Sequence, residues 1–247
     1  MVIDTHTHFY DPARPEGVPW PKEGTSLYRT VLPAHYKKLA EPLGITGTIV
    51  VEASNRAADN DWVLDLADDD PFIRGLVGHV EPAWPDYAQH IRRLGPHPLF
   101  LGIRLGGQAI AEGVGDAAFQ RAMAMLVEHD LQLDLLANAE HLSAVATLAT
   151  ALPDLRIVLD HVAHVKIDGR APDAAWVAAV RAAAAHENIY CKASGMVELA
   201  AERPAPTDPA YYAPTLDVLW AAFGEDRLIY GSNWPVTKHT SSYQSFL

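Results

Sequence analysis

Eight short apolar runs recur along the 247-residue chain, and segments with helical periodicity separate them. Their centres lie roughly 25 to 40 residues apart, the span of a strand–helix unit. The runs are Val2–Thr5, Gly47–Ala53, Ile73–Glu81, Leu99–Leu105, Leu131–Ala137, Arg156–Val162, Ile189–Ser194 and Arg227–Gly231. Strands that alternate with helices form parallel sheets, and eight of them in a chain of this length favour an α/β fold of the (β/α)₈ barrel type. An open doubly wound sheet would carry a G-x-G-x-x-G turn, and the chain has none.

We expect a single barrel domain over residues 1–247, because no repeat or low-complexity tract divides the chain. Only Pro235–Leu247 follow the eighth run, so the final helix is expected to be short or absent. A missing helix would leave an apolar seam that favours a homo-oligomer. Two loops rich in proline, residues 9–32 and 195–209, are expected to cover one end of the barrel.

The charge and composition of the chain limit the classes of molecule that it is expected to bind. The formal net charge of −12 argues against nucleic acid, because phosphate binding needs a basic surface. No apolar segment is long enough to span a membrane, and the N-terminus does not read as a secretory leader. The single cysteine, Cys191, cannot form an intrachain disulfide, and we interpret it as a core residue rather than a nucleophile. These features predict a cytoplasmic protein whose partner is a small molecule.

The first strand ends in the sequence "IDTHTH". Side chains alternate between the two faces of a strand, so Asp4, His6 and His8 are predicted to share one face. If that face points into the barrel, both imidazoles reach its C-terminal mouth, where barrel enzymes carry their sites. Two histidines there suit a metal ion or a polarised carbonyl group.

Polar residues also close several other apolar runs. His161 ends the sixth run, and we assign it to the site; His164 is expected to face solvent, and Asp160 to face away or to orient a neighbour. The other candidates at strand ends, taken as residues that bind substrate, are Glu52, His79, Arg104 and Lys192. For Arg104 a structural ion pair is an equal alternative to binding a substrate carboxylate or hydroxyl group.

After the eighth run comes "YGSNWPV", with Asn233 at the point where a carboxylate could act as a base or hold a metal. An amide accepts no proton near neutral pH and is a poor zinc ligand. We therefore place Asn233 in the site as a residue that positions water or substrate, with Trp234 beside it as a substrate contact.

Together the segments "IDTHTH", "VLDHVAH", "YCKASG" and "YGSNWPV" resemble the amidohydrolase-related branch of the amidohydrolase superfamily. The likeness is closest to its sugar-lactone hydrolases, such as L-fuconolactonase, L-rhamnonolactonase and 2-pyrone-4,6-dicarboxylate lactonase. It extends from Ile3 to Val236 and implies a metal-dependent-hydrolase type of barrel with its site at the C-terminal mouth. His6 and His8 match the family's first-strand pair, His161 its sixth-strand histidine, and Asn233 stands where the family usually has an aspartate.

The resemblance implies a hydrolase of carbohydrate catabolism that opens a lactone of a sugar acid or a related dicarboxylate. In that hypothesis His6, His8 and His161 polarise the ring carbonyl, Asn233 holds the water, and no cofactor is required. The alternative is a zinc-dependent hydrolase or decarboxylase in which His6, His8 and His161 bind the metal. A second alternative, motivated by Asn233, is a catalytically impaired barrel that only binds its ligand. The base is also open, with Glu52, His79 and His161 as candidates.

Overall fold

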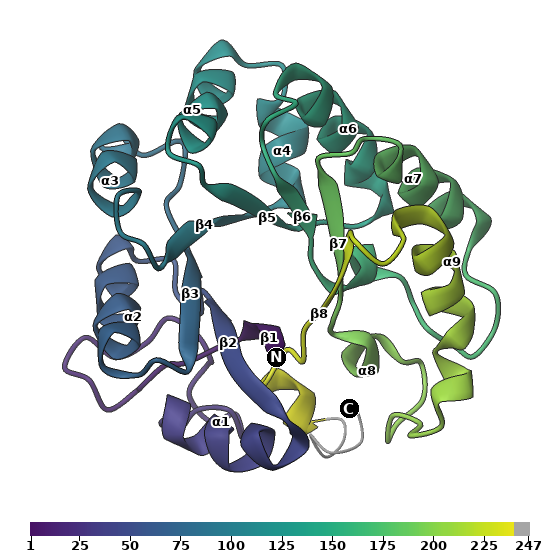
Figure 1. Cartoon of the computed structure of the whole chain (residues 1–247), viewed down its shortest axis with the longest axis horizontal. Coiled ribbons are helices and arrows are strands. Elements are labelled where there is room, and N and C mark those ends of the chain that lie inside the picture. The colour runs from purple at the N-terminus through teal and green to yellow at the C-terminus, as the bar shows by residue number, and fades with distance from the viewer. Residues whose placement is uncertain (240–247) are drawn as a thin grey trace.

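The computed structural model describes residues 1–239, and these residues form a parallel (β/α)₈ barrel (Figure 1). Its strands pair in chain order from β1 to β8. Their bounds are β1 Val2–Thr7, β2 Ile45–Val51, β3 Ile73–Gly78, β4 Phe100–Gly106, β5 Gln132–Leu136, β6 Ile157–Leu159, β7 Ile189–Ala193 and β8 Leu228–Tyr230. The barrel closes just beyond β8, where the His8 amide donates to the Trp234 carbonyl and the Asn233 amide to the His6 carbonyl, both at 2.8 Å.

Helices surround the strands on the outside of the barrel (Figure 1). The α-helices are α1 Pro33–Ala40, α2 Ala57–Asp69, α3 Tyr87–Leu94, α4 Gly107–Gly113, α5 Ala117–Glu128, α6 Leu142–Ala151, α7 Ala174–Ala184, α8 Met196–Leu199 and α9 Ala213–Phe223. Short 3-10 turns are η1 Glu41–Leu43, η2 Ala139–His141, η3 His161–His164, η4 Pro209–Tyr211 and η5 Val236–His239. Asp116 and Asp173 begin α5 and α7 by accepting hydrogen bonds from backbone amides of the first turn.

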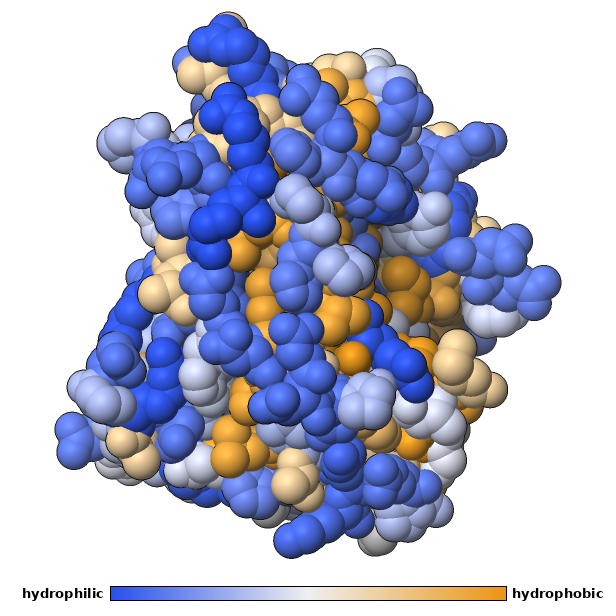
Figure 2. Space-filling view, turned by 60° about the vertical axis from the view of Figure 1, so that its left-hand side comes forward, coloured by the Kyte–Doolittle hydropathy of each residue, from blue (hydrophilic) through white to orange (hydrophobic). Residues whose placement is uncertain are grey.

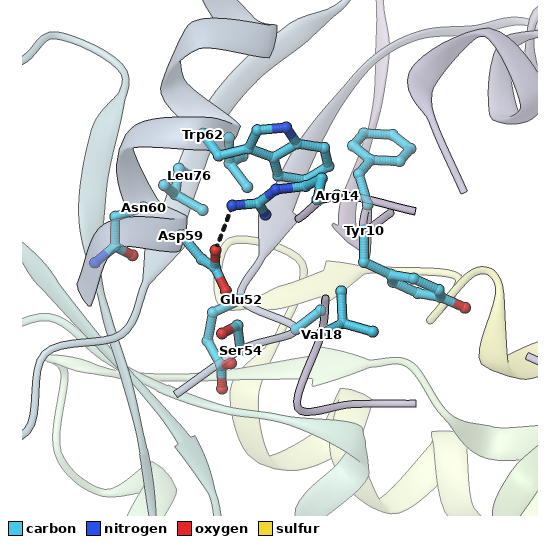
Figure 3. Close-up of a pocket in the computed structure, with 12 residues that line it drawn as sticks. Tyr10, Arg14, Val18, Glu52, Ser54, Asp59, Asn60, Trp62 and Leu76 are labelled. Carbon is cyan, nitrogen blue, oxygen red and sulfur yellow. Dashed lines mark hydrogen bonds and ion pairs between the residues drawn. The ribbon is translucent and has the colours of Figure 1, made fainter. Parts of the chain in front are cut away.

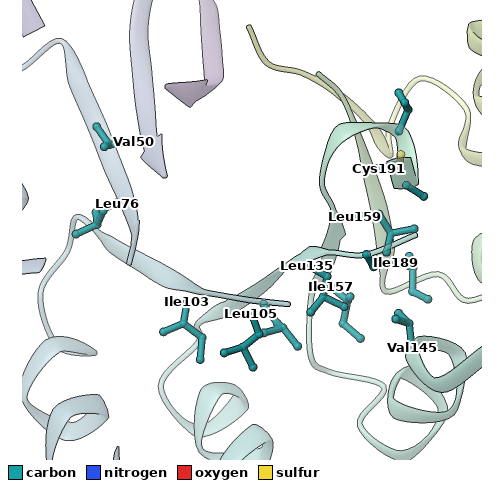
Figure 4. Close-up of a cluster of buried hydrophobic side chains, with 14 of the residues drawn as sticks. Val50, Leu76, Ile103, Leu105, Leu135, Val145, Ile157, Leu159, Ile189 and Cys191 are labelled. Carbon is teal, nitrogen blue, oxygen red and sulfur yellow. The ribbon is translucent and has the colours of Figure 1, made fainter. Parts of the chain in front are cut away.

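The apolar core lies where the outward faces of the strands meet the helices. Ile157 and Leu159 of β6, Ile189 of β7 and Val145 of α6 are all fully buried and gather in one cluster (Figure 4). The runs predicted from apolar periodicity therefore form the barrel because each strand is covered by a helix, which demands apolar side chains. Cys191 lies in the same cluster, as a core residue should, and burial raises the pKa of its thiol.

All eight predicted strands are present, but the sixth is much shorter than predicted. The predicted strand covered Arg156–Val162, whereas β6 ends at Leu159 and the chain then enters η3. After β8 the described part of the chain contains only η5, and the rest of the expected short final helix lies outside the described residues.

The predicted loop over the mouth is confirmed for residues 9–32. Tyr10 and Val31 form a bridge at the two ends of this loop, and Trp20 near its middle lies with its ring 5.7 Å from that of His8. Hydrophilic residues dominate the face in Figure 2, with hydrophobic residues visible between them in the middle. No helix among residues 1–239 is long and apolar enough to cross a membrane.

Candidate active site

A cavity of about 470 Å³ opens among the loops that follow the C-terminal ends of the strands. Five of the residues predicted for the site line it, and they come from four different strand ends and the closure of the barrel: His8, Glu52, Arg104, His161 and Asn233. This volume suits a small organic ligand. The mouth of the barrel is therefore the candidate active site.

The first strand contains a β-bulge, and of its two histidines His8 lines the cavity whereas His6 is buried beside it and does not. The register of β1 against β2 shifts between Asp4 and Thr7, so the strict alternation that we predicted does not hold. Asp4 instead accepts hydrogen bonds from Tyr36 of α1 and from the backbone amide of His6 at 3.1 Å. His6 and His8 still come together, with ring centroids 5.0 Å apart.

The His8 ring is held in one tautomer. Its Nδ1 lies 2.9 Å from the Val51 carbonyl oxygen, which can only accept, so Nδ1 carries the proton. Its Nε2 is then an unprotonated nitrogen in the neutral ring, 3.2 Å from Oδ1 of Asn233. Both atoms are acceptors in this tautomer, so they form no hydrogen bond with each other and can both accept from one donor, such as a water molecule. Burial and, to a smaller extent, the charge of Arg104 lower the pKa of His8 to about 4, so the ring is neutral at neutral pH.

His161 lies on a left-handed turn. The four residues of η3 have φ angles between 47° and 51°, a region that L-residues avoid at roughly 1–2 kcal/mol each. Trp176 of α7 holds the turn by donating its indole N–H to the Val162 carbonyl at 3.2 Å, and Val162 is fully buried. Because of this turn, His161 and His164 both line the cavity, so the prediction that His164 only faces solvent was wrong. Such strain is typical of functional sites.

The three site histidines form one buried cluster. The rings of His6 and His161 lie 4.4 Å apart, and His161 Nδ1 lies 2.9 Å from the Ser194 hydroxyl. Burial lowers the pKa of His161 to about 3 and holds the pKa of His6 well below its usual range, although the Asp160 carboxylate raises both. All three imidazoles are therefore neutral at physiological pH and can donate or accept one proton.

Asp160 is the site residue that sequence reasoning placed least well. It is fully buried, and its carboxylate lies 3.3 Å from both His6 Nδ1 and Lys192 Nζ. Burial alone would raise the pKa of Asp160, but the charge of Lys192 and the contact with His6 Nδ1 outweigh it and hold the pKa well below the usual range. Asp160 therefore contacts His6, which agrees with the second of the two alternatives that the sequence left open.

Lys192 lies below the cavity and does not line it. Its ammonium group is buried between Asp160 and Asp134, with Nζ 2.5 Å from the Asp134 carboxylate. The prediction that Lys192 binds substrate does not fit this position, because its ammonium group belongs to an ion network inside the barrel. Asp134, on β5, gave no signal in the sequence because it stands in the middle of an apolar run rather than at its end.

Arg104 and Glu52 form an ion pair in the wall of the cavity. The Arg104 guanidinium donates to one Glu52 carboxylate oxygen at 3.0 and 2.9 Å, and its Nη1 lies 3.9 Å from Asp160. The positive charge at this wall is therefore already balanced by protein carboxylates. Arg104 thus forms the ion pair of one alternative and also lines the cavity, and its contact with a substrate stays a prediction.

Two other predicted contacts lie away from the cavity. Trp234 packs against Tyr36 and Phe9 with only 2% of its surface exposed, because Asn233 adopts a left-handed φ of 58° and turns the next side chain outward. His79 packs against Trp84, with its ring 5.6 Å away, and does not line the cavity. A direct substrate contact by Trp234 or His79 does not fit these positions.

Contacts that line a side pocket attach the loop of residues 9–32 to the barrel (Figure 3). Arg14 of the loop donates to Asp59 of α2 at 2.8 Å and lies 4.6 Å over the Trp62 ring. Glu52 and Ser54 line this pocket as well as the main cavity. The loop that brings Trp20 over the site is thus attached beside the residues that form the cavity wall.

Three buried groups could hold a metal ion. The ligand atoms of His6, Asp160 and His161 all lie within 4.8 Å of one another. Apart from the 3.3 Å contacts that join Asp160 to His6 and Lys192, the oxygens of Asp160 and the ring nitrogens of His6 have no hydrogen-bond partner among the described residues, so these atoms could bind a metal ion. Imidazole and carboxylate groups suit zinc. The geometry therefore includes two of the three predicted ligands and replaces His8 with Asp160.

Barrel and mouth together define a class. A (β/α)₈ barrel whose C-terminal mouth gathers first-strand histidines, a histidine after β6 and metal-binding donor atoms is the architecture of a hydrolase of the amidohydrolase type. The family profile described as Amidohydrolase matches residues 3–247, so the chain belongs to the amidohydrolase family.

Named relatives share nearly the whole chain. This chain is 34% identical over 251 residues to the L-fucono-1,5-lactonase of Burkholderia ambifaria, and the alignment covers 99% of this chain and 85% of that protein. It is 29% identical over 258 residues to the L-fucono-1,5-lactonase of Burkholderia multivorans, over 98% of this chain and 85% of that one. An amidohydrolase crystal structure from Burkholderia multivorans with bound zinc superposes with a TM-score of 0.84 at 30% identity, over 99% and 88% of the two chains.

Proposed function

We propose that this protein is a hydrolase that opens the lactone of a sugar acid by adding water at the barrel mouth. The observation that carries this proposal is a cluster of three buried, neutral imidazoles, two of which, His8 and His161, line a cavity of about 470 Å³. The two related L-fucono-1,5-lactonases support the choice of a cyclic ester. The proposal includes a small molecule as the partner and a role in carbohydrate breakdown in the cytoplasm.

His161 is the group that polarises the lactone carbonyl. The Ser194 hydroxyl oxygen accepts from the His161 backbone amide at 3.3 Å, so its own hydrogen is free to be donated to His161 Nδ1. That tautomer leaves a proton on Nε2, which can donate to the carbonyl oxygen and to the oxyanion that forms from it. A single donor of this kind contributes about 3–4 kcal/mol to stabilisation of the transition state.

His8 is the group that accepts the proton of water. The Val51 carbonyl fixes its proton on Nδ1, so the neutral Nε2 faces the cavity with a lone pair. Water forms its bond to the carbonyl carbon as its proton passes to this nitrogen, and the ring oxygen takes that proton when the ester bond breaks. His161 thus donates from one tautomer and His8 accepts in the opposite tautomer. Because neither role needs a carboxylate at position 233, an amide there is compatible with hydrolysis.

The charges of the cavity favour a neutral substrate. Arg104 is the cation among the lining residues, and Glu52 and Asp160 already balance it. A dicarboxylate would need positive charge without a protein partner, whereas the hydroxyl groups of a sugar lactone need only hydrogen bonds. Sugar lactones are therefore the better substrate class than pyrone dicarboxylates.

A metal-dependent hydrolase is the second candidate, because His6, Asp160 and His161 offer ligand atoms close together and a zinc ion is bound in the related Burkholderia multivorans structure. A bound divalent ion would act as a Lewis acid towards the carbonyl oxygen. In that case His6, Asp160 and His161 would hold it, while His8 and Asn233 would still bind the water.

The test is acid release from a panel of sugar lactones, with a pyrone dicarboxylate lactone beside them, by protein that has been treated with a chelator and analysed for metal. Turnover of sugar lactones supports the leading proposal. Turnover only after zinc is restored supports the metal-dependent form. Saturable binding of sugar acids without turnover in either condition would contradict both and indicate a barrel that only binds its ligand.

A further inference from the structure

A second carboxylate, Glu198, lies directly behind Asn233. The Asn233 amide nitrogen donates to Glu198 Oε1 at 3.3 Å, while the amide oxygen lies 3.2 Å from His8 Nε2. Glu198 belongs to α8, the short helix that follows β7, and does not itself line the main cavity. The side chain of Asn233 therefore bridges the cavity and an acidic group outside it.

The backbone of Asn233 cannot move to change this contact. Its amide donates to the His6 carbonyl at 2.8 Å, and its carbonyl accepts from Val236 at 2.9 Å. What remains free is a half-turn of the side-chain amide, which exchanges its oxygen and nitrogen ends. Which end faces the cavity then depends on what Glu198 can donate or accept.

Glu198 has few charged neighbours among the described residues. Arg203 is the nearby cation, and its guanidinium donates to the Glu198 backbone carbonyl at 2.8 Å. The Thr237 hydroxyl and the Asn233 amide are the hydrogen-bonding groups at the carboxyl, and Tyr212 is the other titratable group that interacts with it. Burial outweighs these contacts and raises the pKa of Glu198 to about 7.

A carboxylate only accepts hydrogen bonds, whereas a carboxylic acid can also donate one. When Glu198 is ionised, it binds the NH₂ end of Asn233 and the amide oxygen faces the cavity. When Glu198 is protonated, it can donate to the amide oxygen, and the NH₂ end turns towards the cavity. The site therefore presents an acceptor in the first state and a donor in the second.

We propose that Glu198 is a positioning residue for hydrolysis, which in its ionised form aims the Asn233 carbonyl oxygen at the attacking water. This inference rests on the proposed function for its consequence in catalysis. The proposal explains how the site could work with an amide after β8. An aspartate at position 233 would carry a negative charge itself, whereas here that charge lies on Glu198, which contacts Asn233. The amide transmits its effect by hydrogen bonds, and no proton crosses it.

The kinetic test compares Glu198→Gln with Glu202→Gln, an exposed glutamate nearby, across the pH range that brackets the Glu198 pKa of about 7. The wild type and Glu202→Gln should gain kcat as pH rises through this value, because ionisation fixes the amide oxygen towards the cavity. Glu198→Gln should lose this inflection and fall by about 10-fold in kcat at the alkaline plateau, with KM nearly unchanged. A Glu198→Gln enzyme that keeps the wild-type pH profile would overturn the proposal.

A spectroscopic test does not depend on turnover. In protein labelled with ¹⁵N at asparagine, the side-chain NH₂ signal of Asn233 is assigned by its absence from Asn233→Ser. It should shift with a midpoint near 7 in the wild type, following Glu198, and show no such titration in Glu198→Gln. Titration without lactone turnover would contradict the proposed function and leave the Glu198–Asn233 coupling intact. No titration in the wild type would overturn the coupling itself.

Discussion

Replacing Lys192 with methionine should destabilise the barrel strongly. The ammonium group lies 2.5 Å from Asp134 and 3.3 Å from Asp160, and all three side chains are buried. At an effective dielectric constant of about 20, these distances correspond to attractions of about 7 and about 5 kcal/mol. Desolvation of the ammonium offsets much of this in the wild type. Its removal leaves Asp134 with no ion-pair partner among residues 1–239 and Asp160 with only the more distant Arg104, and the expected net loss is about 3–5 kcal/mol.

The assay is urea unfolding followed by circular dichroism. With a slope of roughly 3 kcal/mol per molar urea, the midpoint should fall by about 1–1.7 M. The matched control is Lys37→Met, which removes a partly exposed lysine 2.8 Å from Asp70 and should cost less than about 1 kcal/mol. The deficit of Lys192→Met should shrink as pH falls, because Asp134 and Asp160 without their cation titrate at raised pKa and become neutral. A loss no larger than that of the control would refute the reasoning.

Three further outcomes follow from the same geometry. Tyr36→Phe removes a donor from the buried Asp4 carboxylate and should lower the free energy of unfolding by about 1–3 kcal/mol, measured in urea. The His8 pKa of about 4 lies below the unfolded value of 6.5, so the unfolded chain binds more protons between these values; stability should fall as pH drops through this window, which thermal unfolding at several pH values checks. Arg104→Lys loses the paired contact with Glu52 and should raise KM by about 10-fold with a smaller change in kcat.

Apolar periodicity predicted the barrel because every strand contains the apolar pattern. Each strand must be apolar on the side that meets the helices, and eight such runs at regular spacing leave few alternatives. The ends of strands were harder to predict. Nothing in "VLDHVAHV" indicates that residues 161–164 adopt a left-handed turn, because this conformation is held by Trp176 of α7, which lies outside this segment.

The site residues divide in the same way. His8, Glu52 and Arg104 could be predicted because they stand at or next to strand ends, which meet at one edge of the barrel. For Asp160 the sequence left two alternatives open, and it gave no indication of Glu198, since the contacts of these residues with His6 and Asn233 are created only by the folded chain.

Backbone geometry explains the remaining differences. The bulge in β1 breaks the alternation that was expected to group Asp4 with the histidines. The left-handed conformation of Asn233 turns Trp234 into the packing between the barrel and α1 rather than into the cavity. Both effects depend on single backbone angles, which a pattern of residue types does not specify.

The central claim is that His161 stabilises the oxyanion of a sugar lactone in this cavity. The most direct measurement is kcat/KM on the best sugar lactone for the wild type, His161→Ala and His79→Ala, a histidine of the same mouth that does not line the cavity. The account predicts a fall of about 100- to 1,000-fold for His161→Ala and little change for His79→Ala. Equal activity of the wild type and His161→Ala, in protein shown to be folded, would contradict it.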